Sequence, residues 1–289
     1  MKKIRIIALS AMVAGVFVSC QKDDVNQVQP ESSLELSKSH IEALQKAGVN
    51  PIGATYQMVQ HFDEKPYQVI ATGNMNGVKD LLLDVSKLEE YALGSGEGDT
   101  RQYRTNNLIS SRNRTIDILG YTGSCCALSG NMRTGLQWAV NNYNRINTTL
   151  NFRLTFGTNY QAADMVVYNN GGSGAGGQAE FPSGGRPGKF IQILDGTGRL
   201  SNNLNEHVIG HEMGHAVGFR HTDYARRKCD GSNEGTAGSI GAVHIPGTPT
   251  ANRWGQSGLD SGSLMISCFD GSEDGEFSNA DITALEFLY

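Results

Sequence analysis

The sequence predicts an α+β domain, and three observations lead to that class. Short segments of alternating apolar and polar residues are interleaved with two helical patterns between residues 115 and 216. Of the 289 residues, 38% are hydrophobic, which is enough to bury a substantial core. The 36 glycines and only 18% charged residues indicate many turns and loops. A net charge of -5, without any cluster of Lys and Arg, argues against nucleic acid as the main partner.

The first twenty residues, MKKIRIIALSAMVAGVFVSC, predict a signal peptide over residues 1–19. Basic residues precede an apolar run that is shorter than the about 20 residues needed to cross a bilayer. The ending FVSC resembles a bacterial lipoprotein signal, which implies that Cys20 carries lipid and anchors the chain to a membrane. The following QKDD resembles a short export tag. We therefore expect an outer-membrane lipoprotein, displayed at the cell surface or released from it.

Residues 20–104 predict a tether followed by a pro-segment or accessory region. The tether, residues 21–37, is polar and has no apolar period. A helix is expected in residues 39–50, a strand in 67–73, and either a strand or a helix in 78–93. The stretch GSGEGDT at 94–100 fits either a processing site or an ordinary surface loop.

Residues 105–289 predict the functional domain, which contains most of the periodic segments. Strands are expected at 115–120, 150–157, 163–170, 178–181 and 189–196, and helices at 132–146, from Asn202 onward, and at 279–289. Ser201 is a suitable N-cap for the second helix. The stretch GGSGAGG does not end in the Gly-Lys-Ser/Thr of a phosphate-binding loop, so nucleotide binding is not expected.

Four cysteines follow Cys20, and an even number in an exported chain favours disulfides. We expect Cys229 and Cys268 to pair, because they bracket the segment that follows the histidine cluster. Adjacent Cys125 and Cys126 cannot easily bond each other without strain, so their state stays open.

The segment HEMGHAVGFRH, residues 211–221, predicts a catalytic zinc site. On a helix, His211 and His215 lie about 40° apart on one face, so both imidazoles can bind one ion. Gly218 can end the helix in a left-handed conformation that returns the chain and brings His221 to the same ion. Three nitrogens with an open fourth position are typical of catalytic zinc, and Glu212 is placed to act as general base toward the bound water.

Two other interpretations of the histidines have less support. A histidine-rich surface helix would not require Gly218 or His221, and a purely structural zinc site would not require Glu212 or an open position. His207 precedes His211 by one turn, and we expect it to support the site or cap the helix rather than to bind the metal.

The string His211-Glu212-x-x-His215-x-x-Gly218-x-x-His221 resembles the long zinc signature of the metzincin metallopeptidases. Within this clan the chain is similar to the dual-action HEIGH metallopeptidase family over roughly residues 105–289. The resemblance implies a zincin-like domain with a twisted mixed sheet, two main helices and a small loop-rich C-terminal subdomain. It also implies that Met265, in SLMISC, lies in a tight turn beneath the zinc.

The resemblance also implies where a peptide substrate binds, namely along an exposed edge strand above the zinc. The matching residues here are Gly177, Gln178, Ala179, Glu180 and Phe181. An ordinary hairpin strand is the alternative for this segment.

The chain departs from the clan in two respects. Some metzincins have a zinc-assisting tyrosine two residues after the turn methionine, and here that position is Ser267. Others are kept latent by a cysteine of the pro-segment, but residues 21–124 contain none, so any latency must use another device, such as a carboxylate or simple obstruction.

The sequence therefore predicts a surface-anchored or secreted zinc endopeptidase, with one catalytic Zn²⁺ and protein or peptide substrates. We expect a monomer whose membrane contact is the lipid at Cys20. The acidic loops at 230–235 and 270–276 could bind Ca²⁺, but neither is a full calcium loop and solvated turns explain them as well. The alternative function is a surface adhesin that retains the zinc fold without activity.

Overall fold

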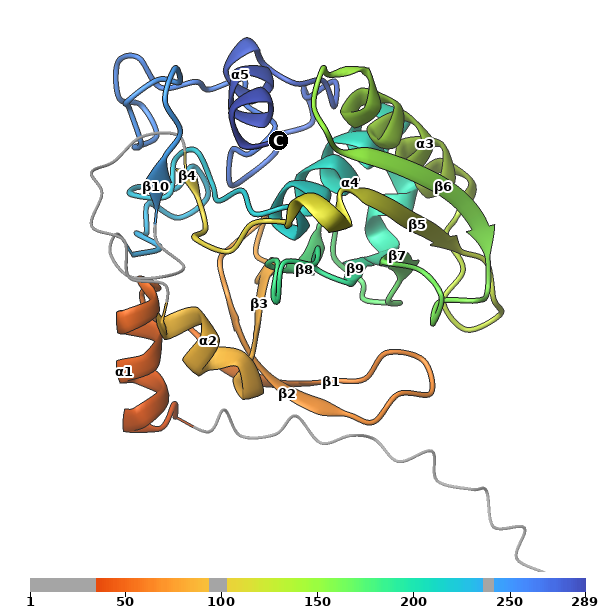
Figure 1. Ribbon diagram of the computed structural model, residues 1–289, viewed down its shortest axis with the longest axis horizontal. Coiled ribbons are helices and arrows are strands. Elements are labelled where there is room, and N and C mark those ends of the chain that lie inside the picture. Colours follow the sequence, from red (N-terminus) through yellow and green to blue (C-terminus); the bar gives the residue numbers. More distant parts are fainter. Residues whose placement is uncertain (1–34, 94–102, 236–241) are drawn as a thin grey trace, which may run out of the picture. The chain divides into compact units, whose positions relative to one another are not determined.

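An eight-stranded mixed sheet lies at the centre of the computed structural model, which describes residues 35–93, 103–235 and 242–289 (Figure 1). The signal peptide, Cys20 and the stretch at 94–100 lie outside the described residues. The helices are α1 (Lys38–Ala47), α2 (Leu88–Leu93), α3 (Gly130–Arg145), α4 (Asn202–Ala216) and α5 (Asn279–Leu288), with short 3₁₀ helices η1 (Val85–Lys87), η2 (Ser111–Asn113) and η3 (Asp195–Arg199). The strands are β1 (Thr55–Val59), β2 (Tyr67–Thr72), β3 (Leu81–Asp84), β4 (Tyr103–Arg104), β5 (Thr115–Tyr121), β6 (Asn151–Gly157), β7 (Met165–Asn169), β8 (Gly177–Glu180), β9 (Phe190–Ile193) and β10 (Val243–His244).

The sheet combines a parallel half with an antiparallel hairpin from the N-terminal region. Its strand order is β1-β2-β3-β8-β9-β7-β5-β6. Strands β6, β5, β7 and β9 pair in parallel, β8 is antiparallel to β9, and β3 is parallel to β8. Strands β1, β2 and β3 therefore belong to the same sheet as the strands of the predicted functional domain.

Helices α3 and α4 pack closely against each other beside the parallel half of the sheet. Gly135 permits this approach, because a Cβ there would come within 2.6 Å of the Asn205 backbone carbon. The main apolar core lies between these helices and the sheet, with contributions from Ile116, Ile118, Leu136, Val140, Val208, Met213 and Ile191. Helix α4 is buried on all sides from Leu204 to Ala216, so its histidines are held within the core rather than on a surface.

The α+β class is confirmed, and most predicted elements are found near their expected positions. Ser201 caps α4 by accepting a hydrogen bond from the Leu204 amide. The ambiguous segment 78–93 contains both alternatives, strand β3 followed by helix α2. Strands β1, β4 and β10 were not predicted from the sequence. No helix among the described residues has the length and apolar character needed to cross a membrane.

The prediction of an exposed edge strand at residues 177–181 is wrong for the chain as a whole. Residues 177–180 do form strand β8, and Phe181 follows it, but β8 lies inside the sheet. Strand β3 pairs with it in parallel, with Leu81 opposite Ala179 and Leu82 opposite Glu180. The edge is covered because a strand almost 100 residues earlier in the chain is added to it.

Candidate metal centre

The three histidines of the signature come together at the C-terminal end of α4. His211 Nε2 lies 3.0 Å from His221 Nε2, and His215 Nε2 lies 3.2 Å from the same atom. All three side chains are completely buried. The spacing of four residues on α4 and the return of the chain after it therefore direct three ring nitrogens to one point.

The other ring nitrogen of each histidine has an oxygen acceptor. His211 Nδ1 lies 2.8 Å from the Leu264 carbonyl oxygen, and His215 Nδ1 lies 2.9 Å from that of Phe219. His221 Nδ1 contacts the carboxylate of Glu234. Because these acceptors require an N–H at each Nδ1, each ring presents a lone pair at Nε2 when it is neutral. Three lone pairs that face one another at about 3 Å repel unless a cation lies between them, so these residues fit a metal ion.

Gly218 makes the return of the chain possible. Helix α4 ends at Ala216, and Gly218 has a φ of +108°, which a residue with a side chain rarely adopts. The Gly218 amide donates to His215 O and the Phe219 amide to Gly214 O. The predicted helix end is thus found at the expected glycine.

Met265 packs against α4 at Gly214, the residue that immediately precedes His215. A Cβ at Gly214 would come within 2.4 Å of the Met265 sulfur, so glycine leaves the space that the methionine fills. The turn is tied to the site through the Leu264 carbonyl on His211 and through the Met265 carbonyl, which accepts from the Thr222 amide at 2.8 Å. The buried Asp281 of α5 supports the turn by accepting from the Leu264 amide.

Glu212 is fully buried, and both its carboxylate oxygens lack a hydrogen-bond partner among the described residues. Its neighbour on the sheet is Gly177 of β8, where a Cβ would lie only 2.4 Å from Glu212 Cγ. Burial, with the nearby carboxylate of Asp80, raises the pKa of Glu212 well above its usual range. A buried carboxylate without donors is suited to accept a proton from a molecule that enters the site.

Asp80, which the sequence analysis did not identify, lies in the same cluster. Its Oδ2 is 3.0 Å from His221 Nε2, and its side chain is completely buried. Asp80 and the three histidines each offer one ligand atom, and these atoms all lie within 4.8 Å of one another. No local motif marks Asp80, because it is placed by the pairing of β3 with β8.

Glu234 is a second residue that the sequence analysis missed as part of the site. It is buried, contacts His221, and pairs with Arg220 at 3.3 Å and with Arg227 at 3.4 Å. Burial lowers the pKa of His221, but the carboxylates of Glu234 and Asp80 outweigh burial and raise it to about 10. For His215 burial lowers the pKa to about 3. The site therefore favours a positive charge near His221.

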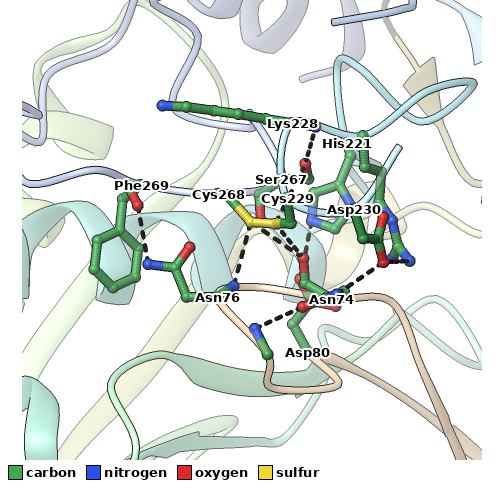
Figure 2. The surroundings of a disulfide bond; sticks show 12 residues. Asn74, Asn76, Asp80, His221, Lys228, Cys229, Asp230, Ser267, Cys268 and Phe269 are labelled. Carbon is green, nitrogen blue, oxygen red and sulfur yellow. Dashed lines mark hydrogen bonds and ion pairs between the residues drawn. A yellow bond between two sulfur atoms is a disulfide. The ribbon is translucent and has the colours of Figure 1, made fainter. Parts of the chain in front are cut away.

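The structure pairs Cys229 with Cys268 in a disulfide, and Cys125 and Cys126 are free (Figure 2). His207 is buried but is not among the clustered ligand atoms. Ser267 donates to Asp223 at 2.9 Å instead of facing the metal site. The two acidic loops form no further group of metal ligands among the described residues, so binding of Ca²⁺ has no support.

Comparison with known proteins finds one family and a number of similar solved structures, among them two of myroilysin. No curated protein matches the chain. A structure of myroilysin is 13% identical, with a TM-score of 0.34 over 59% of this chain and 77% of that one. A second myroilysin structure, also 13% identical, has a TM-score of 0.35 over 59% of this chain and 81% of that one. The model of the dual-action HEIGH metallo-peptidases matches residues 78–289, more than half of the chain, and the protein therefore belongs to this metallopeptidase family.

Proposed function

We propose that the protein is an exported zinc endopeptidase in which His211, His215 and His221 hold the metal and Glu212 acts as general base. The observation that carries the proposal is the convergence of three Nε2 atoms beside the buried carboxylate of Glu212, which has no hydrogen-bond partner in the part of the chain that the structure describes. Membership of a metallopeptidase family supports a metal-dependent peptidase, and the donor set of three imidazoles is one that zinc prefers.

Zinc held by three imidazoles lowers the pKa of water toward about 7 and polarises a carbonyl group. Glu212 removes a proton from the attacking water and transfers it to the leaving amine as the peptide bond breaks. The raised pKa of Glu212 suits this second role, because the residue must hold the proton between the two transfers. Glu234 fixes the ring of His221 through Nδ1, so that its Nε2 would be available to hold the metal together with His211 and His215.

Strand β8 is the proposed docking strand for the substrate. Its backbone begins at Gly177, beside Glu212, and an extended peptide can pair with the side of β8 that β3 covers in the full chain. We also propose that the protein reaches the cell surface through the signal of residues 1–19 and lipid on Cys20. Mass spectrometry of the mature N-terminus tests this, and an unmodified Cys20 or a retained Met1 would contradict it.

The decisive test of catalysis combines zinc content with casein hydrolysis. The chain from residue 20, with Cys20→Ser to keep it soluble, is assayed intact and after light trypsin treatment. We expect hydrolysis that a chelator abolishes and added zinc restores. Glu212→Gln should keep one zinc and lose turnover by about a thousandfold or more, comparable to the loss of a catalytic group.

Glu206→Gln is the matched control, because it neutralises another buried carboxylate of α4 that lies outside the metal cluster. It should keep both zinc and turnover. A Glu212→Gln enzyme with full activity would refute the general-base role. Zinc binding without hydrolysis in every preparation would instead favour the rival function, a surface adhesin with a zinc fold.

A further inference from the structure

The turn between β2 and β3 presents Asp80 to the metal cluster, and its backbone is fixed by β8. The Ala179 amide donates to the Asp80 carbonyl at 2.8 Å, and Gln178 Nε2 donates to the Lys79 carbonyl at 2.6 Å. Gly73, with a φ of +75°, leaves room for the carboxylate, since a Cβ there would lie 1.8 Å from Asp80 Oδ1. The backbone thus holds Asp80 in one position.

The same turn is attached to the loops that surround the site. The Asn76 amide donates to Cys268 Sγ at 3.3 Å, and Asn76 Nδ2 donates to the Phe269 carbonyl at 2.9 Å. Asn74 Nδ2 donates to Asp230 at 2.8 Å. Figure 2 shows these contacts beside the disulfide, with Asp80 and His221 on the same side. The turn is therefore hydrogen-bonded both to the loop that contains Asp230 and to the segment of Cys268 and Phe269.

The Asp80 carboxylate has little to compensate its burial apart from the metal cluster. Oδ2 lies 3.0 Å from His221 Nε2, and neither carboxylate oxygen has a hydrogen-bond partner among the described residues. A carboxylate that is buried without hydrogen bonds carries a large cost in free energy, because its charge has lost the solvating water. A cation bound by the three imidazoles would remove most of this cost, because Oδ2 lies next to His221 Nε2.

We propose that Asp80 is the fourth metal ligand in the intact chain and that residues 73–84 thereby hold the peptidase latent. Three protein ligands leave a position for water, whereas four close the site. Strand β3 at the same time occupies the side of β8 on which a substrate would pair. Access to both the metal and the docking strand then requires that one segment move away.

This inference rests on the proposed zinc site, and cobalt tests it without an activity assay. Co²⁺ replaces zinc in the chain from residue 20, and its visible absorption reports the ligands. Acetohydroxamate, a small chelating ligand, is then added. We expect the wild-type spectrum to stay unchanged at concentrations that shift the spectrum of Asp80→Asn, because only the variant offers an exchangeable position.

Asp84→Asn is the matched control, since it makes the same change four residues along the segment, away from the cluster. Asp84→Asn should behave as the wild type does. In the presence of a chelator, zinc should leave Asp80→Asn at least about tenfold faster than it leaves the wild type or Asp84→Asn, as expected when a protein ligand is lost. Asp80→Asn should also hydrolyse casein faster than the intact wild type.

A hydroxamate-induced shift in the wild-type cobalt spectrum would overturn the proposal, and this holds even if Asp80→Asn does not fold. Equal spectra and equal zinc release for the wild type, Asp80→Asn and Asp84→Asn would overturn it as well. Failure of the proposed function looks different: the cobalt spectra would show Asp80 as a ligand, but no preparation would hydrolyse casein.

Discussion

Two parts of the chain meet at the metal cluster, helix α4 with its returning loop and the turn and strand of residues 73–84. Helix α4 positions His211 and His215 through their spacing of four residues, and the turn at Gly218 brings His221 back to them. The geometry of the three histidines is thus determined by residues close together in the sequence. The N-terminal segment positions Asp80 only through pairing with a strand almost 100 residues later. The histidines stay together because they are close in the sequence. Asp80, in contrast, is held at the site only by noncovalent contacts, which can break while the histidine site stays intact.

The largest expected effect comes from the helix. His215→Ala should lower zinc affinity by at least about a hundredfold, more than the loss of an outer partner, and abolish hydrolysis. Equilibrium competition with a chelator measures the affinity. His207→Ala, one buried histidine earlier on α4, should keep zinc, and equal losses in both variants would show that the effect is only structural.

Gly177→Ala tests how closely the sheet and the helix fit at the site. A Cβ at residue 177 would displace the Glu212 side chain, since it would lie 2.4 Å from Cγ. We expect turnover to fall by about a hundredfold with zinc content unchanged, as for a misplaced catalytic group. Gly157→Ala in β6 meets its nearest atom at 3.7 Å and should be neutral. Full activity of Gly177→Ala would remove the positioning role from β8.

Leu83→Ala weakens mainly the packing of the N-terminal segment. Leu83 is fully buried in a separate cluster with Leu44 and Tyr91, and its truncation should cost about 3 kcal/mol. We expect hydroxamate to reach cobalt in this variant, because β3 is held less firmly. Leu136→Ala in the main core should cost about as much without opening the site. If both variants open the site equally, the two regions do not differ in the way described.

The smallest effect concerns the far end of α4. Burial and the neighbouring Glu276 raise the pKa of Glu206 to about 7, while Arg145 and the hydrogen bond from Asn142 oppose the shift. Because the folded chain then binds more protons than the unfolded chain between about pH 4.5 and pH 7, stability falls as pH rises through this range. Glu206→Gln should remove this loss, on the order of 2 kcal/mol, so its stability relative to the wild type should be greater at pH 8 than at pH 4.5. Denaturant unfolding at the two pH values measures it, and an equal difference at both would contradict the assignment.

The sequence predicted the parts of the fold and site that depend on nearby residues. The capping serine of α4, the paired histidines and the glycine turn follow from spacing within 21 residues. The edge position of β8 was wrong and Asp80 was missed, because both depend on a partner distant in the chain. Glu234 lies only 13 residues from His221, but it belongs to an irregular loop in which no spacing rule marks a partner of the site. Strand pairing between residues 81–82 and 179–180 leaves no periodic signal that links the two segments.

The disulfide between Cys229 and Cys268 links two loops of the metal site to each other but does not link either of them to residues 73–84. It closes a loop with a separation of 39 residues, which stabilises the fold by about 4 kcal/mol in the loop-entropy view. It joins the loop after His221 to the segment after Met265, whereas Asn74 and Asn76 only touch it. Detachment of residues 73–84 therefore breaks no sulfur bond and needs no reductant. In an oxidising environment the disulfide can therefore keep the loops after His221 and Met265 together while residues 73–84 detach from the site.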